Sequence, residues 1–152
     1  MKNIVILPVC AALLSACSMN IGNIFGGPPG RVGDASSTGE MGVYKTALAQ
    51  RIASANARQL NPERPQALLR AVIVLRYQVD GDGNLLRAEI ARSNGDRAAE
   101  SIAMNSLYNS QPFPRPSAGL MRYGRVELSE TWLFNDDGRF QLRSIAQSQL
   151  SE

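Results

Sequence analysis

Residues 69–92 read LRAVIVLRYQVDGDGNLLRAEIAR, and this stretch decides the fold. Residues 69–79 have a period of two, which predicts a strand with one face on a core. Valines on the second face indicate that it too is partly covered. Residues 80–84 are all Asp, Gly or Asn, which predicts a turn. We expect residues 85–92 to return as a second strand with Leu86, Ala88 and Ile90 facing inward, so the stretch predicts an antiparallel hairpin.

The acidic turn at residues 80–84 has an alternative interpretation as a calcium loop. An EF-hand loop requires Gly at its sixth position and Glu at its twelfth. Counted from Asp80, those positions hold Leu85 and Ala91. The flanking segments are also predicted strands rather than helices. The plain hairpin turn is therefore favoured, and no metal site is expected.

An amphipathic helix is expected on each side of the hairpin in the sequence. The first covers residues 43–60 and ends at Asn61-Pro62, because proline disfavours helical geometry in the residue before it. Its apolar stripe holds Tyr44, Leu48, Ile52 and Ala55. The second helix begins after Asp96, a suitable N-cap, and runs to about Asn109. Its apolar face holds Ala99, Ile102, Ala103 and Leu107.

A proline-rich segment, QPFPRP at residues 111–116, ends the second helix. Proline fixes an extended backbone there, and we expect it to lay Phe113 on the domain. An alternative is that Pro-x-Pro-x-Pro serves as a ligand for an SH3-like groove.

Two further strands are predicted after this segment. Residues 122–134 form a long strand whose apolar face is interrupted by Glu130; the face holds Val126, Leu128, Trp132 and Phe134. The sequence NDDG at residues 135–138 predicts a hairpin turn. Residues 139–145 are expected to return as the last strand, with Phe140 and Leu142 on one face and Gln141 and Arg143 on the other.

Composition narrows the possible function classes. The chain has 152 residues, no histidine and two cysteines, Cys10 and Cys17. The absence of histidine excludes Ser-His-Asp and Cys-His catalysis and the usual zinc sites. The net charge of +3 comes from dispersed arginines, so no nucleic-acid partner is expected. A mild basic excess favours solubility and some affinity for acidic lipid headgroups.

The N-terminal sequence predicts a signal peptide over residues 1–16. A basic residue, Lys2, is followed by an apolar run at residues 4–14 and then by the small residues Ser-Ala before Cys17. The run is too short to span a bilayer, which needs about 20 residues. Its ending, Leu-Ser-Ala-Cys, resembles the lipobox of bacterial lipoproteins. The resemblance implies cleavage before Cys17 and acylation of that cysteine. The alternative is ordinary cleavage with Cys17 incidental. In that family Asp after the cysteine marks inner-membrane retention; Ser18 therefore favours the outer membrane, facing the periplasm.

The remaining boundaries follow from composition. Residues 17–42 are rich in Gly, Pro and Ser and predict a flexible tether. One folded domain is expected at residues 43–146, followed by a polar tail at residues 147–152.

The element order and three local signatures resemble the C-terminal domains of TonB and TolA. The signatures are the strand and Asp-Gly turn at residues 72–83, Ser-Asn-Gly-Asp at residues 93–96 before a helix, and PFPRP at residues 112–116. The resemblance implies an α+β fold, with a small antiparallel sheet of three to four strands packed against two helices. TonB and TolA keep an uncleaved inner-membrane helix and a long spanning segment. This chain is expected to lack both, which argues against energy transduction.

In that family, proteins bind by backbone pairing at a sheet edge. We expect the last strand to supply this edge here, at Phe140, Gln141, Leu142 and Arg143; alternatively, its arginines only guard against aggregation. The expected function is a non-enzymatic module that binds envelope proteins, with acyl chains on Cys17 holding it to the membrane. The alternative is a structural or chaperone-like lipoprotein subunit of an envelope or secretion assembly.

Enzymatic activity is not expected. The candidate acid–base residues are Asp80, Asp82, Asp136 and Asp137, and all lie in Gly-containing turns, where such residues normally bind the backbone. No cofactor and no small-molecule substrate is expected either.

Overall fold

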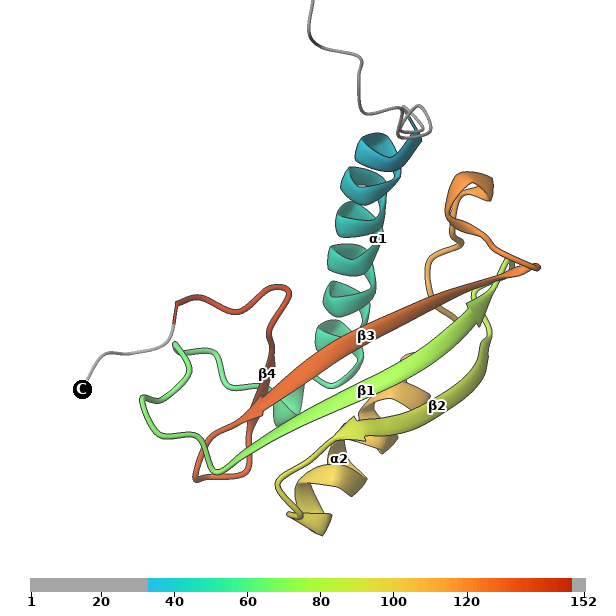
Figure 1. Cartoon of the computed structure of the whole chain (residues 1–152). Helices are drawn as coiled ribbons and strands as arrows, with labels where there is room; N and C mark the ends of the chain where they lie inside the picture. Colours follow the sequence, from blue (N-terminus) through green and yellow to red (C-terminus); the bar gives the residue numbers. More distant parts are fainter. Residues whose placement is uncertain (1–32, 149–152) are drawn as a thin grey trace, which may run out of the picture. The chain divides into compact units, whose positions relative to one another are not determined.

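The structure is a computed structural model that describes residues 33–148 (Figure 1). Its elements are, in order, α1 (Gly33–Ala55), the short 3₁₀ helix η2 (Ala57–Gln59), β1 (Ala71–Asp80), β2 (Leu85–Arg92), α2 (Arg97–Tyr108), the 3₁₀ helix η3 (Ala118–Leu120), β3 (Arg125–Phe134) and β4 (Phe140–Leu142). The strands form an antiparallel sheet in the order β2-β1-β3-β4. Both helices pack on one face and share a single apolar core with it. The expected α+β class is confirmed.

The hairpin of β1 and β2 forms as predicted, and a close contact holds its turn. The Asp80 carboxylate accepts hydrogen bonds from the backbone N–H groups of Asp82 (2.9 Å) and Asn84 (2.8 Å). Gly83 has φ +88°, and its carbonyl accepts a hydrogen bond from Phe113 N at 2.8 Å. Phe113 itself is 4 % exposed, so the proline-rich segment does lie on the domain.

The inward face predicted for β2 is wrong at two positions. Leu86 is 54 % exposed and Ile90 is 42 % exposed, whereas Ala88 and Leu85 pack against the core. The pairing of β2 with β1 explains the exposure of Leu86. Gln78 pairs with Arg87, but the next residue of β1, Val79, pairs with Leu85, so Leu86 has no partner on β1. Leu86 is the extra residue of this bulge. Ile90 lies opposite Leu75 on the outermost strand, where little covers it.

The first helix differs from the prediction at both ends. It begins at Gly33 rather than at residue 43, so the predicted tether (residues 17–42) overlaps it; residues 17–32 lie outside the described part. Contacts explain the early start: Met41 packs against the core and Ser117 donates a hydrogen bond to Glu40. Such tertiary contacts override weak helix propensity. The helix ends at Ala55. Ala55 was predicted to lie on the apolar stripe but is exposed, and the side chain of Asn56 is buried in its place.

A tyrosine joins α1 to the proline-rich segment. The Tyr44 hydroxyl donates a hydrogen bond to the Pro114 carbonyl at 2.9 Å. Burial, followed by the negative charge of Asp80, raises the pKa of Tyr44 to about 12. The phenol therefore stays protonated and available as a donor.

The second helix agrees with the prediction. Its N-cap is Asp96, which accepts a hydrogen bond from Ala99 N at 3.0 Å, and its C-cap is Asn109. Ala99, Ala103 and Leu107 are buried as expected, and Ile102 packs against them. No helix within residues 33–148 combines the length and apolarity that crossing a bilayer requires.

Both C-terminal strands are shorter than predicted. β3 begins at Arg125 because residues 122–125 form a small hairpin of their own, in which Arg122 and Arg125 exchange backbone hydrogen bonds. β4 ends at Leu142, whose carbonyl accepts hydrogen bonds from Ile145 N (3.0 Å) and Ala146 N (2.8 Å). These bonds turn the chain away from the sheet, so β3 extends well past β4.

Candidate functional site

The sequence placed a partner-binding edge at the last strand, and the structure changes that expectation. β4 is an outer strand, as expected, but Phe140 and Leu142 are fully buried and Gln141 is 8 % exposed. Asn61 covers its outer side: Asn61 N donates to the Phe140 carbonyl at 2.9 Å, and Gln141 Nε2 donates to the Asn61 carbonyl at 3.1 Å. Arg143 is exposed but lies past the end of the strand. The expectation of an open edge at residues 140–143 is therefore wrong for Phe140 and Gln141.

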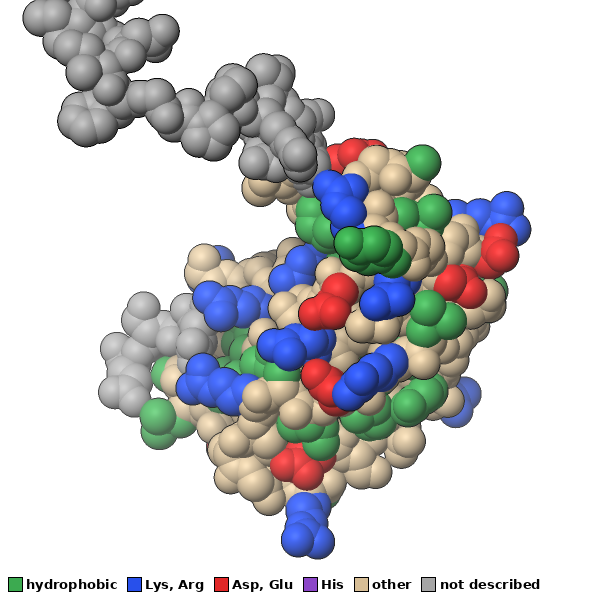
Figure 2. Space-filling model, turned by 45° about the vertical axis from the view of Figure 1, so that its right-hand side comes forward, with side chains coloured by type: hydrophobic (Ala, Val, Ile, Leu, Met, Phe, Trp, Pro, Cys, Tyr) green, Lys and Arg blue, Asp and Glu red, His purple; other side chains and the backbone are tan. Residues whose placement is uncertain are grey.

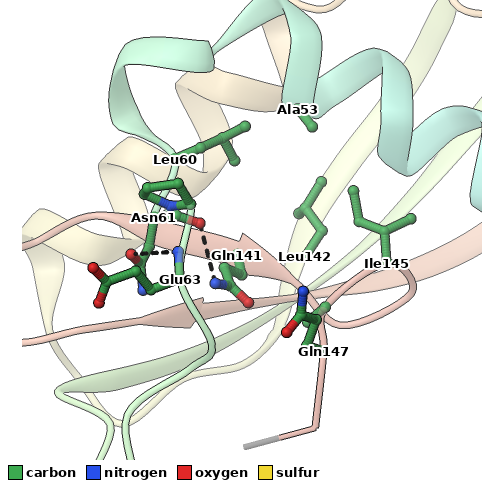
Figure 3. A pocket seen from close by; sticks show the side chains of 10 residues that line it. Ala53, Leu60, Asn61, Glu63, Gln141, Leu142, Ile145 and Gln147 are labelled. Atoms are coloured by element: carbon green, nitrogen blue, oxygen red, sulfur yellow. Dashed lines mark hydrogen bonds between the residues drawn. The ribbon is translucent and has the colours of Figure 1, made fainter.

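A small pocket lies beside this covered edge (Figure 3). Its volume is about 150 Å³, and the side chains of Leu60, Ala53, Leu142 and Ile145 converge on it. Gln141 also lines it, and its Oε1 atom has no hydrogen-bond partner in the described part of the chain. Pockets for drug-sized ligands or cofactors have roughly 300–1,000 Å³. This pocket matches a single side chain rather than a small molecule.

The opposite edge of the sheet, β2, is open but poorly shaped for pairing. Its pairing with β1 contains two register shifts, one between Val74 and Leu75 and one between Gln78 and Val79. Bulges twist a strand and break the even spacing of its N–H and C=O groups, and natural proteins use them to protect edges. β2 also carries charged side chains, Arg87, Glu89 and Arg92.

The remaining edge is the first half of β3. β3 pairs with β1 over its whole length without a register shift, but with β4 only from Trp132 to Phe134. No strand within residues 33–148 lies beside residues 125–131 on the β4 side. We call residues 125–131 the open half of β3. Between its two end residues it is the regular, unpaired edge that strand addition requires.

The direction of the backbone groups in the open half follows from its two ends. Arg125 exchanges hydrogen bonds with Arg122, and the Thr131 carbonyl accepts from Arg143 N at 2.9 Å. Backbone groups alternate sides along a strand. The N–H and C=O groups of Glu127 and Ser129 therefore point outward, and both residues are exposed.

A buried carboxylate lies where the open half ends. Glu130 is 2 % exposed; its Oε1 accepts hydrogen bonds from Thr131 N (2.7 Å) and Ser144 N (3.4 Å), and its Oε2 has no partner among the described residues. No described Lys or Arg forms an ion pair with it. The N–H of Thr131, which follows Ser129 on the outward side of β3, is thus already bound by Glu130. The free outward groups that an added strand can pair with are those of Glu127 and Ser129.

The solvent face of the sheet carries paired charges. Arg76 lies 3.6 Å from Glu89 and 3.8 Å from Glu127, and Arg87 lies 2.9 Å from Glu89. Figure 2 shows acidic and basic side chains intermixed over the face it presents. Exposed pairs of this kind contribute little, about 0–1 kcal/mol each. They give this face no charge of a single sign.

The acidic residues considered for catalysis lie apart. Asp80 is opposite Arg125 at one end of the sheet, while Asp136 and Asp137 follow β3 at the other end. A side-chain hydrogen bond from Asn84 is the main cause that lowers the pKa of Asp80, and the Arg139 backbone N–H is the main cause that lowers the pKa of Asp137. These carboxylates bind their own turns. No group of three or more acidic, Cys or His residues suited to a metal ion is found in residues 33–148.

The other predicted site residue, Cys17, lies outside the described residues. No family model, no curated protein and no solved structure matches this chain. The open half of β3 was missed by the sequence reasoning, although the strand predicted at residues 122–134 is much longer than its predicted neighbour at residues 139–145. That difference in length was the available signal.

Proposed function

We propose that this chain is a non-enzymatic protein-binding module, anchored by acyl chains on Cys17 to the periplasmic face of the outer membrane. It binds an extended segment of an envelope protein by strand addition to the open half of β3. The observation that carries the proposal is the unpaired, regular stretch of β3 next to the three-residue strand β4. The lipobox-like sequence at residues 14–17 and the resemblance to TonB and TolA domains support the compartment and the mode of binding.

Strand addition predicts which backbone groups a partner protects. The amides of Glu127 and Ser129 should exchange rapidly with deuterium in the free protein and become protected when a partner is bound. The outward-facing amide of Ala88 on β2 serves as the comparison, because it belongs to the other edge. Protection at β2 alone would contradict the assignment to β3.

A proline substitution tests the same edge. Ser129→Pro removes an N–H that points away from β1, so the ladder between β1 and β3 stays intact. We expect this variant to fold, by far-UV circular dichroism, and to lose the partner recovered with the wild-type chain from solubilised envelopes. The matched control is Ala88→Pro on the edge of β2, which should retain the partner. Stoichiometric copurification together with aggregation of the isolated chain would instead favour the structural-subunit alternative.

The anchor has an independent test. Mass spectrometry of the mature N-terminus should find an acylated Cys17 as its first residue. A free thiol at Cys17 would contradict the anchor while leaving the β3 edge unaffected.

A further inference from the structure

The small hairpin at residues 122–125, sequence RYGR, carries an aromatic residue that the fold does not need. Its two central residues, Tyr123 (φ +53°) and Gly124 (φ +76°), have the left-handed backbone of a two-residue hairpin loop. Asn and Gly are the ordinary residues at such a position, and a bulky side chain is disfavoured. Tyr123 is also 95 % exposed. A strained aromatic side chain in solvent points to a role outside the fold.

Two arginines flank this tyrosine without a carboxylate partner. Arg122 and Arg125 are exposed and form no ion pair within the described chain. Asp80 lies opposite Arg125 in the ladder, but its carboxylate is bound by the N–H groups of its own turn. Glu40, on α1, accepts a hydrogen bond from Ser117. Arg122 Nη1 donates hydrogen bonds to the Gly119 and Met121 carbonyls, at 3.2 Å each, and these bonds hold this guanidinium at the tip. Beside the aromatic ring the tip therefore offers the guanidinium of Arg125 and the remaining N–H groups of Arg122.

The tip lies at the end of the domain where α1 begins. Arg122 lines one hollow together with Thr38 and Met41 of α1, and Ser117 contacts Glu40 just before η3. Figure 1 shows η3 beside the N-terminal half of α1. From Gly33 the chain leads back to Cys17 over about 16 residues, which span at most about 55 Å. The tip is thus at the end of the domain at which the described chain begins.

We propose that the RYGR tip is a membrane-contact site, which rests on the lipid anchor proposed above. Tyr123 lies at the level of the lipid headgroups, and Arg122 and Arg125 bind anionic phosphate groups of the same leaflet. One aromatic ring and two arginines bind weakly in free solution. A tether raises the effective concentration to the millimolar range, so a weak contact is enough to orient an anchored domain.

The test couples the chain to vesicles without relying on natural acylation. A protein that begins at residue 17 has Cys17 as its only cysteine, because Cys10 lies before that start. Its thiol is joined to a maleimide lipid in phosphatidylcholine vesicles with or without about one third phosphatidylglycerol. Tyr123→Trp supplies a reporter that lipids brominated in the acyl chains quench. The natural Trp132 is fully buried and gives the background.

We expect the indole introduced by Tyr123→Trp to be quenched in the anionic vesicles and to lose most of this quenching in high salt. Adding Arg122→Gln and Arg125→Gln should weaken the contact about 5-fold per arginine. The matched control, Arg58→Gln with Arg97→Gln, removes the same charge from exposed positions on η2 and α2 and should leave quenching unchanged.

Two results would overturn the proposal in these vesicles: quenching of the reporter no greater than that of Trp132, or an equal loss of quenching in the control variant. Shielding of the reporter by a soluble envelope protein instead of lipid would also overturn it. None of these outcomes bears on the open half of β3, so failure of the tip leaves the proposed binding edge to its own tests.

Discussion

At the scale of single residues, Gly83 fixes the hairpin turn against the proline-rich segment. A Cβ added to Gly83 would lie 2.1 Å from the Phe113 carbonyl oxygen, and its φ is +88°. Gly95 has nearly the same φ, +87°, but nothing lies within 4 Å of its added Cβ. Alanine substitutions at the two glycines can therefore be compared to separate backbone strain, present at both, from steric overlap, present only at Gly83.

We expect Gly83→Ala to lower the free energy of unfolding by about 3–5 kcal/mol, because strain and overlap add. Gly95→Ala should cost only about 1 kcal/mol, from strain alone. Urea denaturation of both variants measures the difference. Equal losses would show that the contact between Gly83 and Phe113 does not hold the turn.

Asp96, the acidic N-cap of α2, makes the stability of the fold depend on pH. The Ala99 backbone N–H, followed by a hydrogen bond from Arg70, lowers the pKa of Asp96 from its ordinary 3.8. A carboxyl group whose pKa is lower in the folded state stabilises the fold above its unfolded pKa, and this contribution is lost as the pH falls through the folded pKa. We expect the melting temperature to decline below about pH 4.

Asp96→Asn isolates one part of that decline. Asn keeps a capping acceptor for Ala99 N but carries no charge, so the variant should show a shallower loss of melting temperature between neutral and acidic pH. An unchanged acid slope would contradict a contribution from Asp96. Asp136→Asn, at an exposed residue of the turn between β3 and β4, is the comparison.

At the scale of elements, a buried polar cluster joins α1 to α2. Asn56 Nδ2 donates to the Ile52 carbonyl (2.8 Å), the Ser106 carbonyl (3.0 Å) and Ser110 Oγ (3.1 Å). Trp132 Nε1 donates to Ser106 Oγ at 2.9 Å, which connects the cluster to β3. The cluster therefore aligns both helices on the sheet.

We expect Asn56→Ala to lower the free energy of unfolding by about 2–3 kcal/mol, because it removes all three contacts from a residue that is 7 % exposed. Asn105→Ala, on the exposed side of α2, should stay within about 0.5 kcal/mol. Thermal or urea denaturation compares them. Similar losses in both variants would mean that the buried cluster adds nothing specific.

Element boundaries show what sequence patterns could and could not predict. The hairpin, α2 and the burial of Phe113 follow from periodicity, turn residues and an N-cap, all local signals. The start of α1 depends on Met41 and Glu40 meeting distant residues, and the end of β4 depends on hydrogen bonds from Ile145 and Ala146 to Leu142. Leu86 was misplaced because a bulge shifts the alternation by one residue. Such contacts leave little trace in the local sequence.

At the scale of the whole molecule, the α+β class was predictable, but the free edge was not. The order β2-β1-β3-β4 puts the last strand outermost, as expected. Asn61, a residue far away in sequence, then covers it, and the unpaired segment moves to the first half of β3. The sequence predicted a free edge on the last strand but not the unpaired stretch on β3, because strand length and coverage are decided by tertiary contacts.

The proposed anchor is also a property of the whole molecule, and its two cysteines allow a matched test. If Cys17 carries the acyl chains, Cys17→Ser should move the protein from the membrane fraction to the soluble periplasmic fraction. Stable attachment requires more than one acyl chain, each contributing about 0.8 kcal/mol per buried CH₂, and serine can accept none through a thioether. Cys10→Ser removes the other thiol, within the predicted signal peptide, and should leave the protein in the membrane fraction. Fractionation followed by immunoblotting distinguishes the two. Retention of Cys17→Ser in membranes, or release of Cys10→Ser, would place the attachment elsewhere. Because Cys17 and Gly33 are about 16 residues apart, an anchor at Cys17 keeps the start of α1 within about 55 Å of the lipid.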